Sequence, residues 1–119
     1  MKDFLKGRFK GGITAFKGAV YLIKTEASIQ VQLTIAILVT IAGFVYNISS
    51  TEWMIQCFMI GLVMSAEGLN TAVEEIADFI HPDFHKKIGV IKDVAAGAVF
   101  FAAIVSLVIA GIIYYPKVF

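Results

Sequence analysis

The stretch from Val94 to Tyr115 reads VAAGAVFFAAIVSLVIAGIIYY and contains no charged residue. A helix that crosses a bilayer needs roughly 20 such residues, with about 17–25 tolerated. The backbone must satisfy its own hydrogen bonds in lipid, and the stretch shows no strand-like alternation of apolar and polar residues. It therefore predicts a transmembrane helix and favours an all-α fold.

The composition of the whole chain agrees with a membrane protein. Of its 119 residues, 59% are hydrophobic and 16% are charged, whereas ordinary soluble domains are about 45–50% apolar and about 25% charged. Disorder is excluded because disordered chains are poor in apolar residues. A single cysteine excludes a disulfide scaffold. A water-soluble domain of this size would lack the polar residues to cover its surface.

Two more apolar segments precede the first one described. Residues 31–47 and 53–73 are predicted to cross the membrane, as are residues 94–115. Residues 1–26 differ, because their apolar side chains recur every three to five positions on one face while lysines mostly occupy the other. This pattern predicts an amphipathic helix that lies on the membrane surface, packs its apolar face on the protein itself, or does both. We therefore predict one domain, residues 1–119, with a surface helix and three transmembrane helices.

The cations predict how these helices are oriented. Six lysines and arginines lie in the first 25 residues and three more lie between residues 79 and 92, whereas the link Asn47–Glu52 has none. Segments rich in lysine and arginine stay on the cytoplasmic side. We therefore expect a multi-pass protein of the cytoplasmic (inner) membrane, with its amino terminus and its 79–92 loop in the cytoplasm.

Polar residues interrupt the second span at its cytoplasmic end. At about 100° per residue, four of them lie within roughly 80° of one another on one helix face: Glu67, Asn70, Glu74 and Asp78. Ionisable groups at membrane depth are costly and are functional by default. Alternatively, Glu74 and Asp78, together with the neighbouring Glu75, could belong to a solvated helix end. The stripe, and Glu67 above all, predicts a functional site.

Carboxylates in pairs favour Mg²⁺, which proteins bind through one or two carboxylates together with substrate phosphates. In the predicted topology, Glu26 and the pair Lys92-Asp93 reach the same cytoplasmic surface as the stripe. A lysine, several carboxylates and a metal together predict a phosphate site. A metal site formed by His81 and His85 is a weaker alternative, since Pro82 between them favours a solvated loop.

Small residues recur every fourth position in two of the predicted spans. Ala98, Ala102, Ser106 and Ala110 form one such row, and Gly61 and Ser65 form another. Such rows let helices approach closely. They could pack within one chain, but we favour a homo-oligomer because three spans alone leave much of the carboxylate face unsupported.

The residues EGLNTAVEEIAD, from Glu67 to Asp78, followed by KDVAAGAV from Lys92, resemble the signature of the small prokaryotic diacylglycerol kinase family, which includes undecaprenol kinases. The resemblance implies a surface helix, three transmembrane helices and a homotrimer. It also implies transfer of the γ-phosphate of Mg-ATP to a membrane lipid hydroxyl, diacylglycerol first and undecaprenol as the alternative. The implied partners are ATP, Mg²⁺, the lipid acceptor and the bilayer, with no nucleic acid.

The same resemblance assigns roles to individual residues. Glu67 takes the position of the catalytic base and Asn70 that of its support, while Glu26 and Glu74 take those of the metal-linked carboxylates. The implied nucleotide-binding residues are Arg8, Glu26, Glu74, Asp78, Asp83, His85, Lys92 and Asp93. A small membrane transporter that uses Glu67 as an ion site, or a non-enzymatic membrane protein, is the alternative. It would have no use for the other charged residues at this surface.

Overall fold

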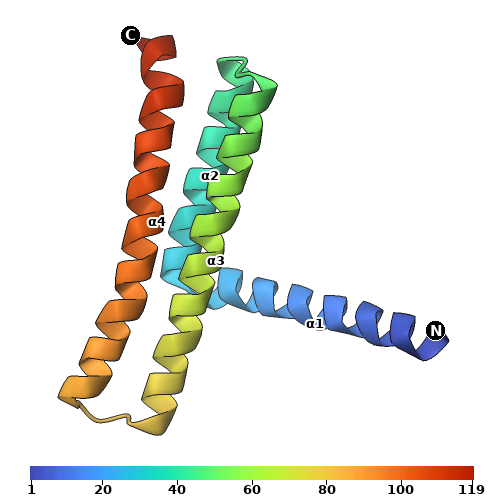
Figure 1. The fold of residues 1–119 in the computed structure, drawn as a ribbon, viewed down its shortest axis with the longest axis vertical. Helices are drawn as coiled ribbons and strands as arrows, with labels where there is room; N and C mark the ends of the chain where they lie inside the picture. The colour runs from blue at the N-terminus through green and yellow to red at the C-terminus, as the bar shows by residue number, and fades with distance from the viewer.

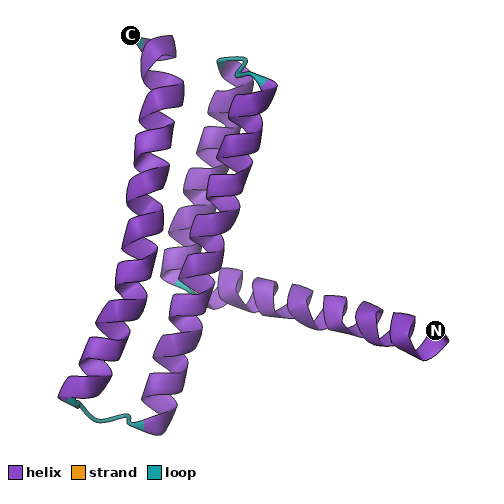
Figure 2. Ribbon diagram, in the orientation of Figure 1, coloured by secondary structure: helices purple, strands orange, loops and turns teal.

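The computed structural model describes all residues from 1 to 119, and its only regular secondary structure is helix (Figure 2). The four helices are α1 (Lys2–Thr25), α2 (Ala27–Val45), α3 (Ser50–Ile80) and α4 (Lys86–Val118). The prediction of an all-α fold is therefore confirmed.

Helices α2, α3 and α4 form an elongated bundle, and α1 extends sideways from its base (Figure 1). Helix α3 packs against both α2 and α4, whereas α2 and α4 make little direct contact with each other. Helix α1 packs mainly against the start of α2 and buries none of its residues. The result is a three-helix bundle with an open side between α2 and α4.

The surface of the bundle is apolar, as a lipid-facing surface must be. Only 12 of the 119 residues are buried, and large side chains such as Phe44, Phe58 and Phe101 are 70% or more exposed. Exposing apolar surface to water has a free-energy cost of about 25 cal/mol per Å², whereas exposing it to hydrocarbon has no comparable cost. Helices α2 and α4 are long and apolar enough to cross a membrane. Helix α3 is not among them, so the span at 53–73 stays a prediction.

The helices are longer than the predicted spans, because hydrophobicity marks only the lipid-facing part while capping residues determine the ends. Helix α3 begins with a capping box: the Glu52 N–H donates to Ser49 Oγ at 3.1 Å, and the Ser49 N–H donates to Glu52 Oε1 at 2.9 Å. At the start of α4, the Lys87 N–H donates to His85 Nδ1 at 3.1 Å. The loop 81–85 between α3 and α4 is non-helical, as Pro82 predicted.

A polar cluster links all three bundle helices at the end away from α1. Gln56 of α3 is 6% exposed; its Nε2 donates to the Val39 carbonyl of α2 at 3.1 Å. Tyr114 of α4 donates its hydroxyl to Gln56 Oε1, and that hydroxyl also lies 3.1 Å from the Val39 carbonyl. Such bonds hold helices together where the hydrophobic effect cannot.

The same end of the bundle carries an ion pair and a tight backbone contact. Lys117 Nζ lies 3.4 Å from Glu52 Oε1, and the hydrogen bond from the Ser49 N–H is the main cause that lowers the pKa of Glu52. The Trp53 ring packs so closely on Gly43 that a Cβ atom there would lie 2.6 Å from its Cη2. Both contacts bring α3 into register with its neighbours.

Candidate active site

Glu67 lies on the buried face of α3, although it is charged in water. It is 9% exposed, and Met59, Val63 and Thr71 on the same face are between 5% and 8% exposed. These residues recur every fourth position and so form one row along the helix. In this row, the Glu67 carboxyl group follows the apolar side chains of Met59 and Val63 and precedes the Thr71 hydroxyl. An acid at the end of an apolar row can meet the polar end of a lipid while the lipid tail stays in hydrocarbon.

Asn70 and Glu74 form a hydrogen-bonded pair one turn apart on α3. Asn70 Nδ2 donates to Glu74 Oε1 at 3.2 Å, and both residues are half-buried. The other end of the amide, Asn70 Oδ1, is buried and has no hydrogen-bond partner. Native proteins rarely leave a buried acceptor unpaired, so this atom points to a ligand of the site.

Asp78 and Lys92 meet across α3 and α4. Lys92 Nζ donates to Asp78 Oδ1 at 2.5 Å, and the two side chains are 37% and 60% exposed. Exposed ion pairs of this kind contribute about 0–1 kcal/mol. The lysine is therefore held beside the polar stripe by a bond that a phosphate group could replace.

The loop between α3 and α4 borders an open hollow beside the candidate site. The hollow has a volume of about 400 Å³, and four of its nine lining residues were predicted to contact a nucleotide: Asp83, His85, Lys92 and Asp93. Within the loop, His81 Nδ1 lies 2.7 Å from the Asp83 carbonyl, and the His81 and His85 ring centroids are 5.2 Å apart. The fold thus gathers these residues, which lie within eleven positions of sequence, around one hollow.

Glu26 stands alone between α1 and α2 and is half-buried. No three acidic, histidine or cysteine side chains of the chain come close enough together to hold a metal ion. Two carboxylates, Glu26 and Glu74, with the unpaired amide oxygen of Asn70, are nevertheless hard oxygen donors. Mg²⁺ needs only one or two protein carboxylates when phosphates and water supply the rest, so these residues fit it.

Arg8, like Glu26, makes no hydrogen bond or ion pair with the other predicted site residues. It is exposed on α1, and the amino-terminal part of that helix extends away from the bundle (Figure 1). Its contact with a nucleotide stays a prediction.

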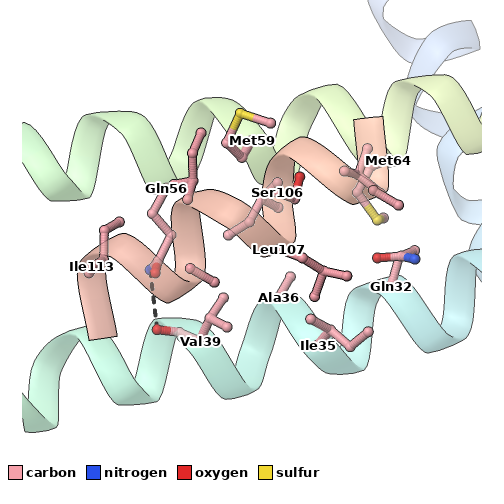
Figure 3. Close-up of a pocket in the computed structure, with 15 residues that line it drawn as sticks. Gln32, Ile35, Ala36, Val39, Gln56, Met59, Met64, Ser106, Leu107 and Ile113 are labelled. Atoms are coloured by element: carbon pink, nitrogen blue, oxygen red, sulfur yellow. Dashed lines mark hydrogen bonds between the residues drawn. The ribbon is translucent and has the colours of Figure 1, made fainter. Parts of the chain in front are cut away.

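An apolar groove runs along the open side of the bundle (Figure 3). It has a volume of about 340 Å³, and twelve of its fifteen lining residues are hydrophobic. Met59 and Val63 form part of its wall, on the same α3 face that carries Glu67. In Figure 3 the Gln56 amide reaches the Val39 carbonyl at one end of the groove, with Gln32 at the other.

The sequence analysis did not identify three polar residues whose side chains form hydrogen bonds in the fold: Gln30, Gln56 and Tyr114. Gln56 and Tyr114 could have been noticed as isolated polar groups in apolar stretches. Their pairing could not, because it joins residues 58 positions apart. For Gln30, the only indication in the sequence was its position four residues, about one helical turn, after Glu26.

Comparison of the sequence with known proteins shows which family the chain resembles. The model of the prokaryotic diacylglycerol kinases matches residues 13–114. An undecaprenol kinase of Bacillus subtilis is 38% identical over 109 residues, which cover 92% of this chain and 89% of that protein. A diacylglycerol kinase of a Synechocystis species is 28% identical over 103 residues, which cover 86% of this chain and 59% of that protein. The chain therefore belongs to the prokaryotic diacylglycerol kinase family.

Proposed function

We propose that this protein transfers the γ-phosphoryl group of Mg-ATP to the hydroxyl group of a membrane lipid at the cytoplasmic surface of the inner membrane. Membership of the family makes the chain a lipid kinase. The observation that carries the detailed proposal is the α3 stripe, where buried Glu67 lies one turn from the Asn70–Glu74 pair and its unpaired amide oxygen.

Glu67 acts as the general base in this proposal. Its carboxylate accepts the proton of the lipid hydroxyl as the hydroxyl oxygen attacks the γ-phosphorus and the bond from that phosphorus to ADP breaks, so that ADP leaves. General-base catalysis typically accelerates a reaction 10²–10⁴-fold. Its place at the end of the apolar α3 row suits a substrate that arrives from the bilayer. Asn70 contributes by holding the Glu74 carboxylate through its amide N–H.

Glu26 and Glu74 hold the metal in this proposal. When bound, Mg²⁺ neutralises charge on the phosphates, and phosphoryl transfer asks for little besides such neutralisation and correct positioning. Lys92 leaves its exposed bond with Asp78 to meet the phosphates. Asp83, His85 and Asp93 line the adjoining hollow, which receives the nucleotide. Asp78 and Arg8 complete the proposed nucleotide contacts.

The membrane arrangement of the proposal has three spans, with α1 lying on the cytoplasmic surface. Phe4, Phe9 and Phe16 of α1 are 65–73% exposed, which suits burial in the interface. The active form is a homotrimer. A Cβ atom at Gly61 would meet nothing within 4 Å, and Ser65 one turn on is exposed, so this small-residue row is unused within the chain and free for a neighbouring subunit.

Diacylglycerol and undecaprenol are the two candidate acceptors. The two relatives are an undecaprenol kinase and a diacylglycerol kinase, and the former shares the higher identity, 38% against 28%. That difference favours undecaprenol, while the family name favours diacylglycerol. Both lipids present a hydroxyl at the polar end of a long hydrocarbon, as the position of Glu67 requires.

The proposal is tested by adding the full-length protein in mixed micelles to labelled ATP, Mg²⁺ and each lipid in parallel. We expect label in at least one lipid, and E67Q should slow its incorporation about 10²–10⁴-fold. Glu75→Gln is the matched control, because Glu75 is on α3 but exposed and outside the proposed site, and it should keep full activity. Absence of label in both lipids, or full activity of E67Q, would contradict the proposal.

A further inference from the structure

The corner between α1 and α2 consists of Glu26 alone. Helix α1 ends at Thr25 and α2 begins at Ala27, and Glu26 between them has extended backbone angles, φ −105° and ψ 116°. The last carbonyl groups of any helix lack partners inside that helix. The Leu22 carbonyl at the end of α1 accepts the Glu26 N–H at 2.9 Å, and the carbonyls that follow need other donors.

Gln30 supplies those donors from the first turn of α2. Its side-chain Nε2 donates to the Ile23 carbonyl at 3.0 Å and lies 3.4 Å from the Lys24 carbonyl. Its backbone N–H donates to the Glu26 carbonyl at 3.0 Å. One residue therefore holds the chain on both sides of Glu26. Rotation about the Glu26 backbone would break one set of these bonds.

A second contact locates the corner against α3. The Leu22 side chain lies over Gly68, where a Cβ atom would be 3.2 Å from Leu22 Cδ1. Gly68 directly follows Glu67 in the sequence. Packing thus sets the distance of the end of α1 from the α3 stripe, while the Gln30 bonds set the direction in which the chain turns at Glu26.

We propose that Gln30 is a positioning residue that orients the Glu26 carboxylate for metal binding, through its side-chain hydrogen bonds to the end of α1. This inference rests on the proposed function of Glu26 as a metal ligand. Gln30 itself is exposed, so losing its bonds should leave the fold intact and change the direction of Glu26. The effect should therefore appear in metal affinity rather than in stability.

The experiment measures binding of Mn²⁺ alone to the full-length protein in detergent, from the decrease of the free Mn²⁺ signal in electron paramagnetic resonance. Gln30→Leu removes the donors and should weaken Mn²⁺ binding about threefold to tenfold, the equivalent of one hydrogen bond. Gln30→Met, which also lacks donors, should do the same. Gln30→Arg restores N–H donors and should recover most of the affinity.

Ser28→Ala is the matched control, since Ser28 is an exposed residue of the same turn whose side chain makes no hydrogen bond; it should bind Mn²⁺ as the unmodified protein does. Glu26→Gln separates the two hypotheses. If it weakens binding while the leucine and methionine variants do not, the positioning role is wrong and the metal role of Glu26 stands. If it changes nothing, both are wrong. An arginine variant as weak as the leucine variant would also overturn the positioning role.

Discussion

Removing the hydroxyl of Tyr114 should destabilise the bundle more than removing the Gln56 amide with which it pairs. Three helices share this polar cluster, because Gln56 of α3 bonds both the Val39 carbonyl of α2 and the Tyr114 hydroxyl of α4. The perturbations are Tyr114→Phe, Gln56→Leu and the double variant.

The expected magnitudes follow from which groups each substitution leaves without a partner. In Gln56→Leu, the Tyr114 hydroxyl retains an acceptor, because the Val39 carbonyl already lies 3.1 Å away. The loss is then about one interhelical bond, roughly 0.6–1.7 kcal/mol in a membrane. In Tyr114→Phe, Gln56 Oε1 stays buried without a donor, which costs about 1–3 kcal/mol. The double variant leaves no buried acceptor without a donor. Its loss of stability should therefore be about 1 kcal/mol smaller than the sum of the losses of the two single variants.

The free energy of unfolding can be followed by titrating the micellar protein with a denaturing detergent and recording tryptophan fluorescence. Trp53 is the single tryptophan of the chain, and its ring packs against Phe44 with centroids 4.9 Å apart. Tyr115→Phe is the control, because Tyr115 is 67% exposed. Equal losses for Tyr114→Phe and Gln56→Leu, or strict additivity in the double variant, would refute this account of the cluster.

Three further outcomes are expected. Glu67→Gln should lower kcat for lipid phosphorylation about 10²–10⁴-fold and leave nucleotide affinity, measured by equilibrium binding, unchanged. A variant with changed nucleotide affinity and unchanged kcat would contradict the role of Glu67 as general base. The Ser49 N–H bond lowers the pKa of Glu52, so the ionised carboxylate stabilises the fold above its unfolded pKa of about 4.3 and stops doing so as the pH falls through the lowered folded value. Glu52→Gln removes the charge and should lower Tm at pH 7, with a difference that disappears in acid. A difference that stayed constant with pH would contradict this role of the Glu52 charge. Gly43→Ala places a Cβ 2.6 Å from the tryptophan ring and should destabilise the bundle by about 1–3 kcal/mol in the same detergent titration; a neutral result would mean that the ring moves freely.

Local patterns in the sequence were enough to predict the helical class, two membrane-suited segments and the polar stripe. Each of these depends on residues close together in the chain. A charge-free stretch such as 94–115 can satisfy its backbone in lipid only as a helix, and the angle of 100° per residue places Glu67, Asn70 and Glu74 on one face wherever the helix packs. The residues of the family signature lie within α3 and α4.

Which distant groups meet depends on how the helices pack. The Tyr114–Gln56 bond, the Lys92–Asp78 pair and the contact of Leu22 with Gly68 join different helices. Hydrophobic periodicity indicates which face of a helix is apolar, but not which helix that face contacts or how far the two helices are shifted along their axes. Side-chain shape and a few polar hydrogen bonds select among many possible packings in lipid. The direction of Glu26 likewise depends on a corner where two helices end, which hydrophobic patterning does not describe.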